Sequence, residues 1–308
     1  MTIRHLFNRA IKYAFDSDYR FLFNVEKGKY DSLSDEEFLR RIFKARMGYD
    51  LDLNNPQTFN EKIQYLKLHN RKPQYTMMVD KYEVRKYISE LIGKEYLIPL
   101  IGAWNNTEEI DFDRLPNQFV LKCNHNSGLG MCICKDKKLI DVNKVKKELD
   151  RGLEQDYYMK RREWPYKNVK RKIVCEKYME DKNGADELSD YKVLCFNGVP
   201  KLVEYHTGRF GSVHTQDYYD LEWNQTKITN IGMHALDIPA EKPVCLDEML
   251  ELSSILAKDI PHVRVDWYVI NGELYFGELT FFNGSGLNPF SSLEDDKLLG
   301  SWIDLNNI

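Results

Sequence analysis

The sequence predicts an α+β protein of several lobes, in which a helical N-terminal region precedes strands that pair as hairpins. Residues 1–75 carry apolar side chains at the spacing of helix faces and show few strand signals. Later segments are instead short runs of apolar or alternating residues, which is typical of strands. Two of these runs end at Asn197-Gly198 and Asn271-Gly272, dipeptides that favour tight turns between antiparallel strands.

Composition indicates a folded, reduced protein. A chain of 308 residues and 36.5 kDa is long enough to bury a large core. Hydrophobic residues make up 43% and charged residues 30%, and the formal net charge of −4 argues against general nucleic-acid binding. The six cysteines include no CxxC pair and several lie in apolar runs, so we expect reduced thiols in a cytoplasmic protein.

The N-terminal region is expected to form an accessory helical layer. Residues 1–16 are basic and place apolar side chains on one helix face, which predicts packing on the protein body and leaves peripheral membrane contact as the alternative. No apolar run is long enough to span a membrane. The turn-like Asn54-Asn55-Pro56 precedes an amphipathic stretch at 59–69, and residues 80–92 read as a helix that ends at Gly93.

The rest of the chain mixes strands with further helices. Phe119–Cys123 alternates as a strand does and runs into a polar, glycine-bearing loop at 125–130. We expect strands at 96–101, 173–179, 191–196 and 201–204, helices around 142–153 and 247–257, a loop from 206 to about 243, and a last hairpin over 262–282.

The last hairpin carries the strongest chemical signal. Strand alternation places Arg264 and Asp266 on one face. A two-residue turn at Asn271-Gly272 would pair Asp266 with Gly277 and send Glu278 to the opposite face, whereas a three-residue turn at 270–272 would put Glu278 across from Arg264. In the second register the two carboxylates are diagonal neighbours roughly 7 Å apart, a range at which they can share two magnesium ions. Exposed salt-bridging charges are the alternative.

Two weaker signals precede the hairpin. Lys122 stands at a strand end before a loop whose small residues allow backbone N–H groups to approach phosphate. The run 176–179 can present backbone groups to an adenine edge, with Met179 as an apolar shelf. Each pattern alone is common in ordinary strands.

In this order the segments resemble the ATP-grasp superfamily, which includes D-alanine–D-alanine ligase and whose fold consists of two α/β lobes that grip a nucleotide. The resemblance implies ATP and Mg²⁺ as cofactors. It assigns Lys81 and Lys122 to the nucleotide, Ser127, Gly128 and Gly130 to a mobile loop over the phosphates, Glu176, Lys177, Tyr178 and Met179 to the adenine hinge, Arg264 with Lys122 to catalysis, and Asp266 and Glu278 to the metal.

The sequence departs from that pattern after the second carboxylate. Glu278-Leu279-Thr280 stands where the ligases carry Glu-x-Asn, so the third metal ligand is Thr280 by position or Asn283 by reach. The ribose contact is also open, with Asp190 as the candidate.

More narrowly, NPQTFNEKIQYLKLHNR, FVLKCNHNSGLG, VCEKYM, DYKVLCFNG and RVDWY with LYFGELTF resemble the TupA-like group of ATP-grasp proteins, over roughly residues 45 to 290. The resemblance implies a ligase that acts through an acyl phosphate and amidates a uronic acid of a bacterial surface polysaccharide with an amino acid or similar amine. It divides the chain into a helical accessory region at 1–75, an N-terminal α/β part at 76–118, a small lobe at 119–175 and a large lobe at 176–308.

Other functions remain open at this stage. A kinase on the same fold would phosphorylate a hydroxyl and release no phosphate. A glycosyltransferase is suggested by the DxD form of Asp111-Phe112-Asp113. The basic residues of 160–172 predict either part of a binding surface for an acidic glycan or an ordinary solvated face; they are Lys160, Arg161, Arg162, Lys170, Arg171 and Lys172.

Overall fold

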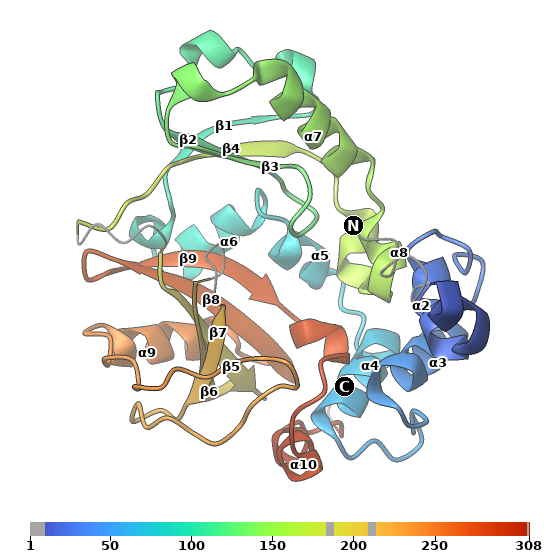
Figure 1. Cartoon of the computed structure of the whole chain (residues 1–308). Helices are drawn as coiled ribbons and strands as arrows, with labels where there is room; N and C mark the ends of the chain where they lie inside the picture. Colours follow the sequence, from blue (N-terminus) through green and yellow to red (C-terminus); the bar gives the residue numbers. More distant parts are fainter. Residues whose placement is uncertain (1–9, 183–187, 209–213, 307) are drawn as a thin grey trace.

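The computed structural model describes residues 10–182, 188–208, 214–306 and 308. Within these residues it contains two antiparallel sheets with helices around them, which confirms the α+β class (Figure 1). All six cysteines are free, as expected. No helix of the described part is long and apolar enough to cross a membrane.

From residue 10 on, the N-terminal region is helical, as the sequence predicts, whereas most of the helix expected at 1–16 lies outside the described residues. Thr58 and Glu61 close a capping box at the start of α4, and Gly48 ends α3 with a left-handed φ of 81°. A separate apolar core, which includes Phe38, joins α2 to α3. The helices of this part are α2 (Ser17–Val25), α3 (Asp35–Met47), α4 (Phe59–His69), α5 (Gln74–Val79) and α6 (Val84–Leu91).

The smaller sheet has the order β1-β4-β2-β3 and is covered on one face by α7 (Val142–Glu154) (Figure 1). Phe119, Leu121 and Cys175 pack with Leu149 of that helix. Alternation therefore turns Lys122 and its neighbours to the other face. The strands are β1 (Leu100–Trp104), β2 (Phe119–Cys123), β3 (Met131–Cys134) and β4 (Ile173–Lys177), so β1 comes from the 76–118 part of the chain.

The larger sheet has the order β7-β6-β5-β8-β9, and α9 (Leu246–Leu256) packs on one face. Trp267 Nε1 donates to Ser253 Oγ of α9 at 2.9 Å, so the odd-numbered residues of β8 face that helix. In Figure 1, α5 and α6 lie between the two sheets. The strands are β5 (Asp190–Phe196), β6 (Val199–Thr207), β7 (Thr215–Tyr219), β8 (His262–Ile270) and β9 (Glu273–Thr280).

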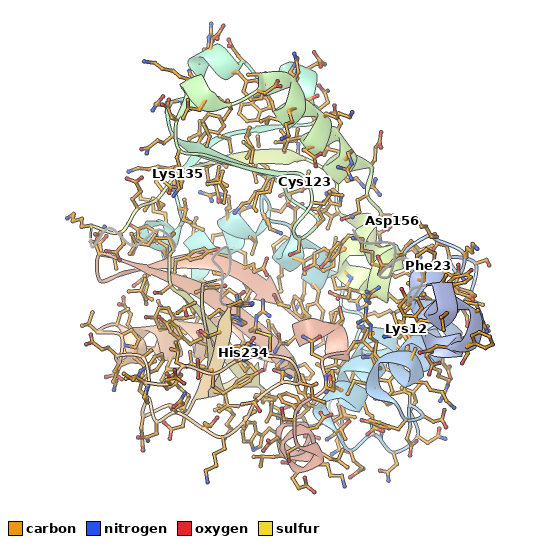
Figure 2. The ribbon with its side chains drawn as sticks, in the orientation of Figure 1. Lys12, Phe23, Cys123, Lys135, Asp156 and His234 are labelled. Atoms are coloured by element: carbon orange, nitrogen blue, oxygen red, sulfur yellow. The ribbon has the colours of Figure 1, made fainter. Side chains whose placement is uncertain are left out.

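Shorter elements connect the lobes. Figure 2 labels Asp156, the residue before α8, where the small lobe meets the helical region that carries Phe23. These elements are α8 (Tyr157–Arg161), α10 (Leu293–Ser301), and the 3₁₀ helices η1 (Lys94–Tyr96), η2 (Thr107–Glu109), η3 (Phe112–Arg114), η4 (Lys137–Leu139), η5 (Trp164–Asn168) and η6 (Asn283–Gly286).

Strand β7 contradicts the loop that we expect from 206 to about 243. All five of its residues are buried although its sequence, TQDYY, lacks apolar alternation. Its polar side chains are hydrogen-bonded instead: Gln216 donates to Glu204 at 2.8 Å, and Asp217 accepts from Gln225 at 2.6 Å. When buried side chains are polar and hydrogen-bonded, the strand shows no alternation of apolar and polar residues, so the sequence pattern does not reveal it.

The turn of the last hairpin also differs from the expectation. Ile270 pairs with Glu273 across a two-residue turn in which Asn271 and Gly272 have φ of 55° and 83°, so the three-residue turn is wrong. A bulge at Gly277 then shifts the register, and Glu278 pairs directly with Asp266. Two neighbouring carboxylates, rather than diagonal ones, therefore share one face of the sheet.

Candidate functional site

A row of charged side chains crosses the larger sheet on the face opposite α9. Strand pairing aligns Glu204 of β6, Lys192 of β5, Asp266 of β8 and Glu278 of β9. The row alternates in sign except at its end, where two carboxylates are neighbours. Two neighbouring carboxylates repel each other, so both stay ionised only if further cations lie nearby.

Lys192 and Arg264 hold Asp266 in place. Lys192 Nζ lies 2.6 Å from Asp266 Oδ2 and 2.6 Å from Asp190 Oδ2. Arg264 donates from Nε to Asp266 Oδ1 at 2.6 Å and from Nη2 to Oδ2 at 2.7 Å. Because Lys192 and Asp266 are both buried, these charge-assisted bonds fix the carboxylate firmly.

Arg264 also binds the residues that follow Glu278. Its Nη1 donates to Asn283 Oδ1 at 2.6 Å, and its Nη2 donates to Thr280 Oγ1 at 3.2 Å. Burial alone would lower the pKa of Arg264, but Asp266, Glu204 and Glu278 together raise it. The guanidinium therefore stays charged and is aimed at the carboxylate pair.

Glu278 is the more accessible of the two carboxylates. Its side chain is 34% exposed; it accepts from Thr280 Oγ1 at 3.2 Å and lies 3.4 Å from Arg264 Nη2 and 3.7 Å from Lys81 Nζ. Burial acts to raise its pKa, whereas Lys81 and Arg264 lower it, and the net shift is downward. Glu278 is thus an ionised and weakly engaged oxygen donor.

Lys81 joins this hairpin to the loop after β2. Its backbone N–H donates to Asn124 O at 3.1 Å, and its ammonium donates to Asn126 O at 2.8 Å. Burial lowers the pKa of Lys81 and the charge of Lys122 adds to this, while Glu278 and Glu176 oppose it. Charges from both lobes therefore act on this one ammonium.

The loop at 124–130 has an anchored base and an exposed tip. Asn124, His125 and Asn126 are buried; Asn126 Nδ2 donates to Gly152 O at 3.1 Å, and burial lowers the pKa of His125 to about 4. Ser127 and Gly128 are exposed. The part of the loop that is open to a ligand is accordingly its tip.

The two loop glycines have different surroundings. A Cβ on Gly130 would lie 2.7 Å from Cys123 Sγ and 2.8 Å from Gly152 Cα, whereas a Cβ on Gly128 would meet nothing within 4 Å. Both have a positive φ. Gly130 is required for packing, and Gly128 leaves free space beside the loop.

We expect Gly130→Ala to cost about 2–4 kcal/mol, because it adds a clash to the unfavourable φ. Gly128→Ala should cost only about 1–2 kcal/mol, the conformational part, but should weaken the binding of an ATP analogue. Thermal denaturation and calorimetric titration measure the two effects. Equal melting temperatures for the two variants would contradict this interpretation.

Lys122 and the strand-end segment at 176–179 form the small-lobe side. Lys122 Nζ lies 2.6 Å from Glu176 Oε2, and Arg85 Nη1 lies 3.2 Å from Oε1. Met131, which pairs with Lys122, and Ile133 are 41% and 43% exposed on the same face. They provide an apolar surface beside Lys122. Sequence reasoning missed this surface, although Met131 and Ile133 are alternate residues of the run MCIC and would share one face of a strand.

The other residues that the sequence assigns to an adenine hinge lie where β4 ends. Lys177 N donates to Pro99 O at 2.9 Å, and Tyr178 and Met179 are half-buried beyond it. Asp190 begins β5 opposite Tyr268. Burial raises the pKa of Tyr268, and Asp190, Glu278, Asp266 and Glu176 act in the same direction, so acidic groups of both lobes surround one tyrosine.

The oxygen donors fit magnesium with phosphate. Among the described residues no three His, Cys, Asp or Glu side chains form a metal-binding group, but Mg²⁺ commonly takes one or two carboxylates and completes its shell with phosphate and water. Asp266 Oδ1 has one described bond, and a carboxylate oxygen can accept two. Asn283 is engaged at both ends, by Arg264 and by Glu204. The Thr280 hydroxyl likewise accepts from Arg264 and donates to Glu278 at 3.2 Å, so Thr280 remains the third donor by its position alone.

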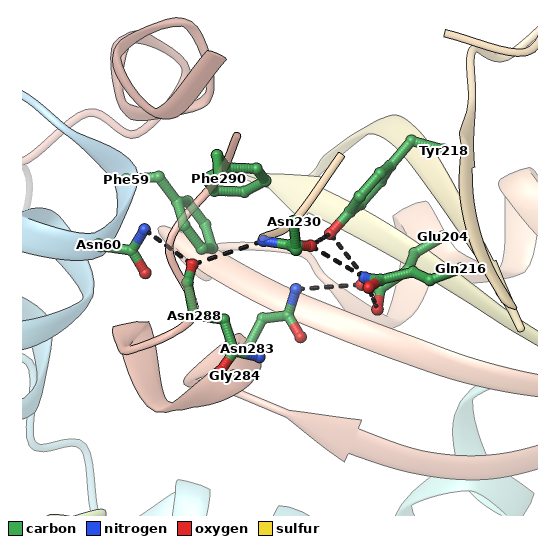
Figure 3. Close-up of a pocket in the computed structure, with 10 residues that line it drawn as sticks. All are labelled: Phe59, Asn60, Glu204, Gln216, Tyr218, Asn230, Asn283, Gly284, Asn288 and Phe290. Atoms are coloured by element: carbon green, nitrogen blue, oxygen red, sulfur yellow. Dashed lines mark hydrogen bonds between the residues drawn. The ribbon is translucent and has the colours of Figure 1, made fainter. Parts of the chain in front are cut away.

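A polar network adjoins the charged row at Glu204 (Figure 3). Glu204 accepts from Gln216 at 2.8 Å and Asn283 at 3.2 Å, and lies 2.6 Å from His206 Nε2. Burial would raise the pKa of Glu204, but His206 and Arg264 outweigh it and lower the pKa to about 2. The adjoining cavity of about 20 Å³ has the size of a water molecule, and Asn283 links this network to Arg264.

Two surface expectations change. Arg162 is 1% exposed, lies over the Phe38 ring and donates to Asp31 O at 3.1 Å, so it is wrong to place it on a glycan-binding surface. Asp111 accepts from the Asp113 N–H at 3.1 Å as the N-cap of η3. The DxD triplet thus has a structural role in a short helix.

A family model described as TupA-like ATPgrasp matches residues 61–304. D-Alanine–D-alanine ligase from Helicobacter pylori is similar over 80% of this chain and 70% of its own, with a TM-score of 0.44 and 14% identity. The Bacillus anthracis ligase complexed with ATP has a TM-score of 0.39 and 17% identity over 67% of this chain, which spans 54% of the length of that enzyme. No curated protein matches the chain.

Proposed function

Because this chain belongs to the TupA-like ATP-grasp family, we propose that it is an ATP- and Mg²⁺-dependent ligase that joins a carboxylate to an amine through an acyl phosphate. The observation that carries the proposal is the position of Lys81. Its ammonium lies 2.8 Å from Asn126 O in the loop of the small lobe and 3.7 Å from Glu278 in the large lobe. A triphosphate between these elements would meet a cation, a loop tip and two carboxylates for magnesium.

ATP with Mg²⁺ supplies the phosphoryl group that turns the substrate carboxylate into an acyl phosphate, from which phosphate can leave. The residues of the chain position the reactants and neutralise charge. Lys81 and Lys122 offset the triphosphate, Asp266, Glu278 and Thr280 hold the metal, and Arg264 faces the transferred group. Met131 and Ile133 offer the adenine ring an apolar surface, and the segment from Glu176 to Met179 offers its edge hydrogen-bonding groups.

The substrate that fits the TupA-like family is a uronic acid of a bacterial surface polysaccharide, to which an amino acid or a similar amine is joined. ATP consumption places the reaction in the cytoplasm. Support for this finer proposal comes from the resemblance of the chain to the TupA-like group.

Phosphate release is the direct test. The protein is incubated with ATP, Mg²⁺, glucuronate or galacturonate, and the common L-amino acids. We expect phosphate release that needs both partners, and a product whose mass is their sum less one water. A product that gains a phosphate, with no free phosphate, would show a kinase; a product formed without ATP would overturn the proposal.

A further inference from the structure

A cavity of about 270 Å³ lies beside the proposed phosphate site and is not used by the mechanism above. It extends from Ser127 at the loop tip to Ser285 in η6, the segment after the metal strand β9. Figure 1 places α8, which supplies one wall, between the small lobe and the helical region. The lining residues are Ser127, Tyr157, Lys160, Arg161, Glu163 and Ser285.

Glu163 is the buried acid of this cavity. It is 6% exposed, and its Oε1 accepts a hydrogen bond from Ser285 Oγ. Burial raises the pKa of Glu163, although Lys67, Ser285 and Arg161 act against the shift. Glu278 adds to the rise, which indicates that the cavity and the metal hairpin are electrostatically close.

Lys67 of α4 holds two walls of the cavity together. It is fully buried, and its Nζ donates to Ser285 O at 2.8 Å, to Arg161 O at 3.0 Å and to Gln64 Oε1 at 3.1 Å. Gln64 Nε2 also donates to Ser285 O at 2.9 Å. Ser285 has a left-handed φ of 56°, a conformation that a serine keeps only where its surroundings impose it. The cavity is thus a built site.

The two cations that line the cavity differ in whether an acidic side chain already binds them. Arg161 is partly engaged, since its Nη2 lies 3.0 Å from Glu26. Lys160 is half-buried and makes no salt bridge with an acidic side chain of the described residues. A ligand here meets two cations, Lys160 and Arg161, and one carboxylate, Glu163.

We propose that this cavity binds the amine co-substrate as an amino acid, with its carboxylate at Lys160 and Arg161 and its amino group at Glu163, which accepts the proton before attack. The inference rests on the proposed function and names the substrate class of the second half-reaction. A uronate alone would leave Glu163 facing another carboxylate, which is unfavourable in a buried place.

The proton balance gives Glu163 a catalytic task. An ammonium group is not a nucleophile, so it first transfers one proton to the Glu163 carboxylate. The amine lone pair then forms the C–N bond with the acyl carbon, the C–O bond to phosphate breaks, and phosphate leaves with that electron pair. The second amine proton goes to the departing phosphate.

Glu163→Gln separates the two half-reactions. With ATP, Mg²⁺ and the uronic acids above, hydroxylamine traps the acyl phosphate without a base. We expect the variant to form hydroxamate within about threefold of the wild-type rate, but to form amide about a hundredfold more slowly at pH 7, with partial recovery at pH 9 as more amine is unprotonated. Unchanged amide formation would overturn the inference, whereas absence of hydroxamate from the wild-type protein would overturn the proposed function instead.

Lys160→Met tests recognition without touching the buried acid. Saturation-transfer NMR with MgADP should detect binding of one or more of the common L-amino acids, and the corresponding methyl esters should compete poorly for the site. The Lys160→Met variant should weaken amino-acid binding on the order of tenfold. Lys147→Met, an exposed lysine of α7, is the matched control and should change nothing. Two results would contradict the assignment: an amino acid and its methyl ester that bind equally well, or binding of glucuronate without binding of any amino acid.

Discussion

Glu278→Gln is expected to abolish turnover while leaving the fold intact. Glu278 is partly exposed, and its described contacts are a hydrogen bond of 3.2 Å from Thr280 and ion pairs of 3.4 and 3.7 Å, so its loss should change stability by at most about 1 kcal/mol. In the proposed reaction the same carboxylate would be a ligand of magnesium. Removal of a single electrostatic contact in such a site costs about 3 kcal/mol, or on the order of a hundredfold in rate, and loss of a metal ligand should exceed this.

Asp266→Asn is the companion variant, and the structure predicts a different pattern for it. Asp266 is buried against Lys192 and Arg264, so neutralising it leaves two cations undercompensated and should cost about 3 kcal/mol or more of stability. We expect weaker dependence on Mg²⁺ together with a lower melting temperature. Phosphate release and thermal denaturation separate the variants; near-normal turnover by Glu278→Gln would defeat the metal assignment.

Sequence reasoning singled out the hairpin of the proposed metal site but did not predict its geometry. Alternation correctly placed Arg264 and Asp266 on one face, and the family match confirms the ATP-grasp resemblance that rested on these residues. The register depended on Gly277, where a Cβ would lie 3.1 Å from Asp266 O. Such a close approach of two backbones accompanies the bulge at Gly277. A single glycine inside a strand does not by itself predict a bulge, because it is found in other local structures as well.

Buried polar residues were the other limit. Lys67 reads as part of an amphipathic helix and Arg162 as part of a basic run, yet both are buried. Their environment comes from segments distant in sequence, such as Ser285 for Lys67 and Tyr30 to Leu33 for Arg162. Periodicity reports which face an apolar residue takes, but it gives no information on a charge that is buried with partners.

Lys192 shows the same limit within the site itself. It follows the predicted ribose candidate Asp190 on β5, and its position in an ordinary strand gave no reason to single it out. The structure places its ammonium 2.6 Å from both Asp190 and Asp266. It is therefore the cation that allows two buried carboxylates to lie on neighbouring strands.

Lys192→Met should accordingly be among the most destabilising single changes in the large lobe. The methionine fills similar space but leaves both carboxylates without their shared partner, and breaking a buried ion pair from one side costs about 3–5 kcal/mol. For a chain of this size that corresponds to a fall in melting temperature of roughly 6 °C or more. Turnover should also fall, because Asp266 loses one of the two cations that orient it.

A second substitution distinguishes charge from packing. Asp190→Asn in the Lys192→Met background neutralises one of the two carboxylates that have lost this cation, so the double variant should melt at a higher temperature than Lys192→Met alone. Lys201→Met, an exposed lysine on the adjacent strand β6, is the matched control and should leave the melting temperature unchanged. If Lys192→Met melted like that control, the lysine would contribute no net stabilisation, and the account of how this sheet holds its acidic row would be wrong.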